Sequence, residues 1–390
     1  MIRPSARLER LPTYVIAELG VAKRRLLAEG RDVIDVSVGD ADLAPPAPAV
    51  QALKEAVDDP AMSRYAWQVG LPAFRESASR YMDRRFGVHV DPMTELQPLL
   101  GSKEGLVNLA MAFVNPGDVC VLPDPGYPPY IGGTILAGAD AELVPLAAER
   151  DFLVELDAIP EERLARTRLV YLNYPNNPTA AVAPPDYLKR TVALCRERDI
   201  LLAYDNPYCE IVFDGYRAPS IFEIPGARDV AVEFHSVSKT FSMTGWRLGW
   251  AVGSKDLIGP LTRIKTYVDT GAFLAVQRAG AAALDDAEAL VAPTRAEFRK
   301  RRDATLEALA SIGLPAPTPK ATMYVWVPLP EGRESMPFVM EVLEREAVVL
   351  LPGTTFGVGG EGYVRIALTL GAERLREAVE RVGRVLEAGA

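Results

Sequence analysis

Histidine and cysteine are scarce in this chain of 390 residues. It has two histidines and three cysteines, Cys120, Cys195 and Cys209, which are widely spaced and form no C-x-x-C pair. An odd number of scattered cysteines argues against a disulfide framework. The same shortage argues against a zinc site and against histidine-rich metal chemistry. The sequence therefore predicts no metal, and it predicts reduced cysteines of the kind found in the cytoplasm.

Long apolar runs and strongly basic segments are also absent. No window approaches the ~18 apolar residues of a membrane-spanning helix, and Met1–Pro4 leads into no signal-peptide core. With 43 basic and 52 acidic residues the net charge is −9, which disfavours general nucleic-acid binding. We interpret the short basic run Arg299–Arg302 as a solvated helix face. We therefore expect neither nucleic acid nor membrane as a partner, and a cytoplasmic location.

The composition is that of a globular chain, with 49% apolar and 24% charged residues. Between residues 95 and 255, short apolar runs alternate with helical patterns such as Lys103–Phe113 and Pro185–Arg198. Runs that are almost wholly apolar are typical of parallel strands covered on both faces, and the alternation predicts βαβ units. The expected strands are Leu96–Leu100, Val119–Leu122, Ala141–Leu146, Leu169–Leu172, Ile200–Ala203, Val230–Phe234 and Leu248–Val252.

The character of the sequence changes after about residue 275. The pattern there predicts long helices within Val276–Ile312, followed by a smaller α+β unit. We expect an α/β fold in which residues 41–280 form a large domain with a mostly parallel seven-stranded sheet flanked by helices. Residues 281–390 form the smaller domain, and residues 1–40 pack on it because they cannot form a core alone. The expected elements of the smaller domain are strands Met323–Val327, Val348–Leu351 and Tyr363–Leu368 and helices Met336–Glu346 and Ala372–Leu386.

A lysine with small hydroxyl neighbours follows the predicted strand Val230–Phe234. Lys239 stands between Ser238 and Thr240, and Arg247 lies eight residues further on. A lysine at the end of a buried strand is costly unless it is paired, neutral or covalently modified, and a Schiff base with an aldehyde removes its charge. Hydroxyl and guanidinium groups are suited to hold a phosphate beside it. The pattern alone is also compatible with a surface lysine.

An aspartate follows the predicted strand Ile200–Ala203. Asp205 lies 34 residues before Lys239, and ligands of α/β sheets bind at the carboxyl ends of strands. A carboxylate at that edge can pair with a protonated ring nitrogen, as the pyridinium of pyridoxal phosphate (PLP) requires. Taken alone, such an aspartate is more often a helix cap. The combination with Lys239 favours the cofactor site.

Two further turns lie at the ends of predicted strands. Asn177, in the segment Tyr174–Thr179, offers an amide at the same sheet edge as Asp205, although the segment is also a plain Pro/Asn turn. The segment Gly101–Gly105 opens a helix with small residues. Exposed backbone N–H groups and the helix dipole favour an anion there, but a Gly-rich turn by itself is weak evidence.

Together these segments resemble the PLP-dependent aminotransferases of fold type I, the aspartate aminotransferase superfamily. Within it they look most like the LL-diaminopimelate aminotransferase-like branch. The resemblance extends from about Leu11 to the final helix. It rests on Gly-Ser-Lys-Glu-Gly at 101–105, Pro-Asp-Pro-Gly-Tyr-Pro at 123–128, Asn-Tyr-Pro-Asn-Asn-Pro-Thr-Ala-Ala-Val-Ala at 173–183 and Glu-Phe-His-Ser-Val-Ser-Lys-Thr at 233–240.

The resemblance implies PLP as the cofactor and a role for each candidate residue. Lys239 forms the Schiff base and moves the proton between substrate and cofactor, while Asp205 keeps the ring nitrogen protonated. Asn177 and Tyr208 hydrogen-bond the 3-oxygen of the ring, and Tyr127 stacks on its face. The catalytic residues implied are therefore Lys239, Asp205 and Tyr208. The residues implied to hold the phosphate are Ser102, Lys103, Ser236, Ser238 and Arg247.

The resemblance also implies a homodimer with shared active sites, because Tyr65, five residues before Gly70, would reach the phosphate of the neighbouring subunit. On the substrate side, Arg365 would bind the α-carboxylate, a task for which a bidentate guanidinium is better suited than a lysine. The residues implied on this side are Arg365, Asn177, Gly39 and Tyr14.

The implied activity is transfer of an amino group from LL-diaminopimelate, or an N-succinylated relative, to 2-oxoglutarate. Aspartate, alanine or aromatic donors are alternatives, and a PLP-dependent C–S β-lyase is a less favoured one. A PLP-binding transcriptional regulator is disfavoured, because the acidic chain has no appended basic domain.

Three positions depart from the usual pattern. Ala180 stands where the wider superfamily has glycine after Asn-Pro-Thr, so the backbone there must suit an alanine. Phe241 and Ser242 stand where the branch more often has Tyr and Asn. These changes leave the lysine chemistry intact but bear on the substrate.

Overall fold

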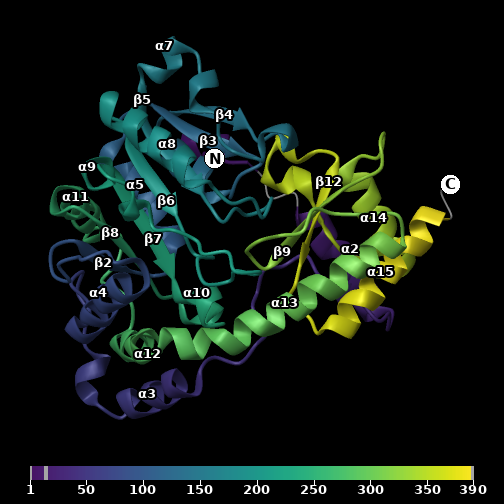
Figure 1. Ribbon diagram of the computed structural model, residues 1–390, viewed down its shortest axis with the longest axis horizontal. Helices are drawn as coiled ribbons and strands as arrows, with labels where there is room; N and C mark the ends of the chain where they lie inside the picture. Colours follow the sequence, from purple (N-terminus) through teal and green to yellow (C-terminus); the bar gives the residue numbers. More distant parts are fainter. Residues whose placement is uncertain (1, 13–15, 388–390) are drawn as a thin grey trace.

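The computed structural model describes residues 2–12 and 16–387 and contains two sheet-based regions (Figure 1). The larger region has one seven-stranded sheet with the order β2-β8-β7-β6-β5-β3-β4. Strand β8 runs antiparallel to both neighbours and the other pairs are parallel, which confirms the mostly parallel sheet. The strands are β2 (Leu96–Leu99), β3 (Val119–Asp124), β4 (Asp140–Pro145), β5 (Thr167–Asn173), β6 (Leu201–Asp205), β7 (Ala231–Ser236) and β8 (Gly249–Gly253).

Both faces of the central strands of this sheet are buried, and successive side chains of a strand point to opposite faces. On β5, Leu169 and Tyr171 join the core under α5, α6 and α11, whereas Val170 and Leu172 join the core under α8 and α9. This is why the strands read as continuous apolar runs. The covering helices are α5 (Ser102–Phe113), α6 (Pro129–Ala137), α8 (Pro185–Glu197), α9 (Ala227–Val230) and α11 (Lys255–Lys265).

Three helices pack together beside the β2 end of the sheet, with α12 in contact with both α3 and α4. Helix α4 begins at Pro72 and is followed by Gly87 with φ +69°, which is the usual placement of these two residues at helix ends. The bounds are α3 (Ala47–Val57), α4 (Pro72–Phe86) and α12 (Leu274–Asp285), and the short helix α7 covers Glu161–Leu164.

The smaller region has an antiparallel sheet with the order β11-β12-β9, covered by helices. Helix α13 passes from one region to the other (Figure 1), since its Val291 lies in a core of the larger region and its Phe298 in the core of the smaller one. The elements are β9 (Tyr324–Pro328), β11 (Leu351–Pro352), β12 (Tyr363–Ala367), α13 (Ala287–Ser311), α14 (Ser335–Glu346) and α15 (Ala372–Glu387).

The N-terminal segment contacts both regions: α1 lies against α6 of the larger region, where Arg10 donates to the Ala139 carbonyl at 3.2 Å, whereas α2 and β1 lie against the smaller region. Leu19 and Leu26 of α2 are buried in its core, and β1 pairs in parallel with β10. The segment then continues through Gly39 toward the larger region, which places its backbone between the two sheets. The bounds are α1 (Ala6–Arg10), α2 (Ile16–Ala28), β1 (Ile34–Asp35) and β10 (Val348–Val349).

Two expectations from the sequence were wrong in detail. The run Val348–Leu351 is not one strand: its first half, β10, pairs with β1, and Leu351 begins β11, which pairs with β12. The basic run is not uniformly a solvated face, because Arg301 and Arg302 are buried. Arg301 pairs with Asp42 at 2.6 Å, so the charge is neutralised within the fold. Arg302 likewise pairs with Asp214 at 2.5 Å.

Among the described residues, no helix combines the length and apolar character needed to cross a membrane.

Candidate active site

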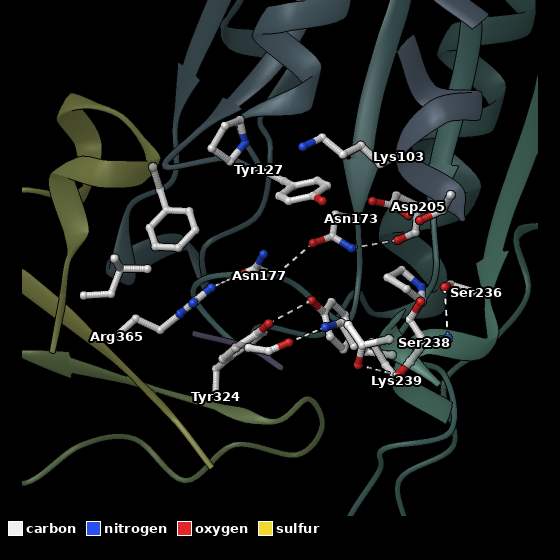
Figure 2. Close-up of a pocket in the computed structure, with 18 of the residues that line it drawn as sticks. Lys103, Tyr127, Asn173, Asn177, Asp205, Ser236, Ser238, Lys239, Tyr324 and Arg365 are labelled. Atoms are coloured by element: carbon white, nitrogen blue, oxygen red, sulfur yellow. Dashed lines mark hydrogen bonds between the residues drawn. The ribbon is translucent and has the colours of Figure 1, made fainter. Parts of the chain in front are cut away.

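A cavity of about 290 Å³ lies where the carboxyl ends of β5, β6 and β7 meet the smaller region. Its walls come from both sheets and from the N-terminal segment, as Figure 2 shows. The carboxyl edge is where parallel sheets bind ligands. The lining residues are Gly39, Ser102, Lys103, Tyr127, Pro128, Asn173, Asn177, Asp205, Pro207, Tyr208, Ser236, Ser238, Lys239, Thr244, Arg247, Tyr324, Leu351, Thr355, Phe356 and Arg365.

Lys239 lies on the four-residue helix α10 (Val237–Thr240), directly after β7. The helix starts where Ser236 Oγ accepts a hydrogen bond from the Ser238 N–H at 3.1 Å. The lysine Nζ points into the cavity and donates to the carbonyl oxygen of Gly39. A primary amine is therefore held at the cavity wall by a neutral acceptor, with no carboxylate paired to it among the described residues.

Asp205 ends strand β6 and is 2% exposed. Its Oδ2 accepts a hydrogen bond from the Tyr130 hydroxyl at 2.8 Å, and its backbone carbonyl accepts from Asn173 Nδ2 at 2.7 Å. Burial raises the pKa of Asp205 to about 7. Its Oδ1 is buried and has no hydrogen-bond partner among the described residues. The site thus offers a carboxylate oxygen to a proton donor in the cavity.

Polar groups gather at one end of the cavity around the first turn of α5. Ser102 and Lys103 open this twelve-residue helix, whose N-terminus favours an anion. Gly101, with φ +80°, allows Arg247 to approach, because a Cβ at that position would lie 2.5 Å from Arg247 Nη2. Ser236 and Ser238 approach the same end from the start of α10. This cluster of hydroxyl, ammonium and guanidinium groups can bind a phosphate.

The opposite end of the cavity is formed around Arg365 of β12, which is 5% exposed. Its Nη1 donates to Asn177 Oδ1 and its Nη2 to the Ser37 carbonyl, both at 2.7 Å. Its Cζ lies 4.1 Å from the ring centroid of Tyr324 and 4.8 Å from that of Phe356. Burial lowers the pKa of Arg365, and no carboxylate neutralises it in the described chain. A carboxylate ligand is the natural partner for such a guanidinium.

Tyrosines occupy the middle of the cavity. The hydroxyl of Tyr208 lies 3.2 Å from that of Tyr324. Tyr127 lies edge-to-face with Tyr130, their centroids 5.7 Å apart, and Figure 2 shows its ring over the space between Asn177 and Asp205. An aromatic ring at that place can stack on a flat ligand.

The cavity brings together all the site residues predicted from the sequence except two. Tyr65 lies on the surface, 68% exposed, and does not line the cavity; its expected contact is with a second subunit. Tyr14 lies outside the described residues. Sequence reasoning missed Asn173, Tyr130 and Tyr324. Asn173 could have been found because it stands at the start of the quoted 173–183 segment, but nothing local marks the other two.

The described residues contain no cluster of three or more His, Cys, Asp or Glu side chains suited to a metal ion.

Comparison with known proteins identifies the family. Residues 31–382 match the family model described as aminotransferase class I and II. The chain is 45% identical to LL-diaminopimelate aminotransferase 2 of Nostoc sp. over 377 residues, 96% of this chain and 97% of that protein. It is 45% identical to LL-diaminopimelate aminotransferase of Aquifex aeolicus, covering 98% of this chain and 99% of that one.

Among solved structures, the chain is similar to a probable N-succinyldiaminopimelate aminotransferase from Thermus thermophilus. The TM-score is 0.91 at 38% identity, covering 95% of this chain and 100% of the other. The chain belongs to the class I and II aminotransferase family, and the enzyme class that this family defines is the transaminase. The family predicted from the sequence motifs is confirmed.

Proposed function

We propose that this chain is a PLP-dependent aminotransferase that moves an amino group from LL-diaminopimelate, or its N-succinylated relative, to 2-oxoglutarate. The amino-acid and 2-oxo-acid classes follow the family, and the particular donors follow the names of the relatives. One observation carries the proposal: a lysine amine, a carboxylate oxygen and a guanidinium face the same cavity, and within residues 2–12 and 16–387 the oxygen has no hydrogen-bond partner and the guanidinium no carboxylate.

The donor set fits pyridoxal phosphate. A protonated pyridine nitrogen supplies the hydrogen-bond donor that the buried Oδ1 of Asp205 lacks, and its positive charge offsets the cost of burying that carboxylate. Figure 2 shows Lys103 and Ser236 at the Asp205 end and Arg365 at the far end, so a ring with a phosphate on one side can be accommodated. When bound, the cofactor supplies an aldehyde that condenses with amines and a ring that withdraws electrons.

The residues that line the cavity would then each have a role in binding the cofactor or in catalysis. Lys239 would carry the cofactor, and Ser102, Lys103, Ser236, Ser238 and Arg247 would hold its phosphate. Asn177 and Tyr208 would contact the 3-oxygen, while Tyr127 would stack on the ring. Lys239 Nζ would act as a general base that takes the proton from the α-carbon of the substrate and delivers it to C4′ of the cofactor. The Gly39 carbonyl would hold the amine in place.

Substrate recognition would begin with Arg365. The two Nη atoms of its guanidinium now donate to the Asn177 side-chain oxygen and the Ser37 carbonyl. On substrate binding they would donate to the α-carboxylate of the amino acid instead. Beyond it lie Leu351, Phe356 and the Thr355 hydroxyl, which is buried without a partner among the described residues. Arg365 is the guanidinium that the described chain places at this end, so a second carboxylate of the donor would have to be bound by hydroxyl or amide groups or by a second subunit.

A homodimer is part of the proposal. The chain exposes an aromatic surface that includes Tyr65, Trp67 and Tyr267, which are 68%, 61% and 85% exposed. The Tyr65 and Trp67 rings lie 5.5 Å apart. The segment that carries Tyr267 packs against the segment that carries Trp67, because a Cβ on Gly271 would meet the Trp67 carbonyl. Exposed apolar patches of this kind mark interfaces. A second copy would cover it and receive Tyr65 at its phosphate.

A cytoplasmic location is also proposed, since the three cysteines are free and buried, as in a reducing compartment.

The test is a panel of amino donors assayed with 2-oxoglutarate and ranked by kcat/KM. We expect LL-diaminopimelate or N-succinyl-LL-diaminopimelate to rank first, ahead of aspartate, alanine and aromatic amino acids. A higher kcat/KM for one of those donors would contradict the proposed substrate but leave the transaminase in place. Release of pyruvate and ammonia from a β-substituted amino acid, without transfer to the oxo acid, would instead support the β-lyase.

A further inference from the structure

Tyr324, which the sequence motifs did not single out, lies at the centre of the cavity. It lies on β9, is 2% exposed, and its hydroxyl is 3.2 Å from that of Tyr208. Arg365 covers its ring, with Cζ 4.1 Å from the ring centroid. Figure 2 shows Tyr324 and Lys239 pointing toward one another from the two regions of the molecule. The hydroxyl is therefore surrounded by the groups that the proposed reaction uses.

The backbone at Gly39 fixes the place of this hydroxyl. A Cβ built on Gly39 would lie 2.0 Å from Tyr324 Oη, so the hydroxyl fills the space that a larger residue at position 39 would need. The carbonyl of the same glycine accepts the hydrogen bond of Lys239. One segment of the chain thus positions both the lysine amine and the tyrosine hydroxyl.

Charged and titratable groups from other elements of the cavity face the two tyrosines. The charged and titratable groups that face Tyr324 are Arg365 of β12, Lys239 of α10 and Tyr208 after β6. Burial raises the pKa of Tyr324, but the positive charges of Arg365 and Lys239 and the hydrogen bond with Tyr208 lower it further than burial raises it. Burial raises the pKa of Tyr208 well above its usual value. The 3.2 Å between the two hydroxyls allows either one to donate. When Tyr208 uses its single proton at the 3-oxygen of the cofactor, it has only lone pairs left for Tyr324, so in that arrangement Tyr324 donates and Tyr208 accepts.

We propose that Tyr324 is a positioning residue that donates its hydroxyl proton to Tyr208 and thereby directs the Tyr208 hydroxyl at the 3-oxygen of the bound cofactor. The inference rests on the proposed function, in which Tyr208 contacts that oxygen. A phenol has one O–H donor, so Tyr208 keeps its own proton for the 3-oxygen only when it accepts from Tyr324. A hydrogen bond donated to this oxygen withdraws electron density from the cofactor. The Schiff-base nitrogen that joins the cofactor to Lys239 then loses its proton at a lower pH.

The test follows the visible absorption of the cofactor-loaded protein as a function of pH. Tyr324→Phe keeps the ring under Arg365 and removes only the hydroxyl. We expect the pH midpoint of the absorption change to rise by about half a unit, the effect of one hydrogen bond. Tyr208→Phe raises it more. The double variant matches Tyr208→Phe alone, because Tyr324 acts through Tyr208.

Two further variants complete the design. Tyr187→Phe removes a buried hydroxyl that donates to the Val154 carbonyl at 2.9 Å outside this cavity, and it should leave the midpoint where it is. Gly39→Ala displaces the Tyr324 hydroxyl without altering Tyr324 itself, and it should raise the midpoint. This second route keeps the test decisive if Tyr324→Phe folds poorly.

The outcomes separate the inference from the proposed function. A wild-type protein that shows no cofactor-dependent absorption overturns both. A wild-type band that titrates normally, with an unchanged midpoint in Tyr324→Phe, overturns the role of Tyr324 and leaves the proposed function standing. Additive shifts in the double variant also overturn it, because they mean that Tyr324 does not act through Tyr208.

Discussion

The two ends of the cavity are built in different ways. At the end proposed to bind the phosphate, here called the phosphate end, Ser102, Ser236 and Ser238 each lie at or just after the end of a strand of the same sheet. At the end proposed to bind the substrate carboxylate, here called the substrate end, Arg365 comes from the second sheet and is held by Asn177 and by the backbone of the N-terminal segment. The first end depends on short stretches of sequence, whereas the second exists only after segments far apart in the chain have packed together. Substitutions at the two ends should therefore have different consequences.

Asp205, at the end of the cavity opposite Arg365, should give the largest effect. Asp205→Ala is expected to lower kcat by several orders of magnitude while the protein still binds cofactor, since the ring nitrogen would no longer be kept protonated. Asp205→Asn, which keeps the size but removes the charge, should behave similarly. The measurements are kcat and cofactor Kd for each variant. Near-normal turnover in either one would show that the carboxylate is not part of the site.

The same residue gives a pH dependence without the cofactor. Burial raises the pKa of Asp205 from 3.8 to about 7, so the folded state binds this proton more tightly than the unfolded state. The free energy of unfolding of the cofactor-free protein should therefore fall as the pH rises from about 4 to 7. Urea unfolding at several pH values measures this slope. Asp205→Asn should flatten it, and an identical slope in the variant would contradict the assignment.

At the substrate end, Arg365→Lys should lower kcat/KM for the amino donor about 10- to 100-fold, the loss of a bidentate charge-assisted contact. Cofactor Kd should change little, because Arg365 lies away from the phosphate group. Steady-state kinetics and a cofactor titration measure the two separately. A large loss of cofactor affinity with unchanged kcat/KM would reverse the assignment of the two ends.

At the phosphate end, Ser238→Ala should raise the Kd of the cofactor about tenfold through the loss of one hydrogen bond to a charged group. The matched control is Ser335→Ala, which removes a buried hydroxyl bonded to Glu361 in the smaller region, 2.8 Å away. Fluorescence or absorption titration with the cofactor compares them. Equal Kd values for the two variants would mean that Ser238 does not touch the phosphate.

The smallest effect is expected in the turn that carries Asn177. Ala180 has φ +59°, in the left-handed region, which costs a non-glycine residue roughly 1 kcal/mol. Ala180→Gly should therefore raise the free energy of unfolding by up to about 1 kcal/mol. Ala183→Gly, at a buried position outside the left-handed region, should lower it. Chemical denaturation of both variants tests this. A lower free energy of unfolding in Ala180→Gly would contradict the proposed backbone strain at Ala180.

Much of the fold could be predicted because it is encoded locally. A strand covered on both faces is an apolar run, and the seven runs expected between residues 95 and 255 all became strands of the large sheet. The run Val348–Leu351 was misjudged because its two halves pair with different partners, β1 and β12, which no local pattern shows. Arg301 and Arg302 were misjudged because each pairs with a carboxylate distant in sequence, Asp42 or Asp214, in addition to a nearby one. The domain limits at residues 40 and 280 stay predictions.

The site follows the same division. Lys239, Asp205 and Asn177 could be predicted because each stands in a motif at the end of a strand. Tyr324 could not, because its importance comes from contacts with Gly39, Tyr208 and Arg365 that arise only in the folded chain. The contact of Tyr65 with a second subunit stays a prediction for the same reason.

The most direct test of the account is reduction of the cofactor-loaded protein with borohydride, followed by peptide mass analysis. The account predicts that the purified protein absorbs visible light with pyridoxal phosphate, and that reduction adds the mass of one reduced cofactor at Lys239. A colourless protein in excess cofactor, or an adduct found on another lysine and not on Lys239, would contradict it.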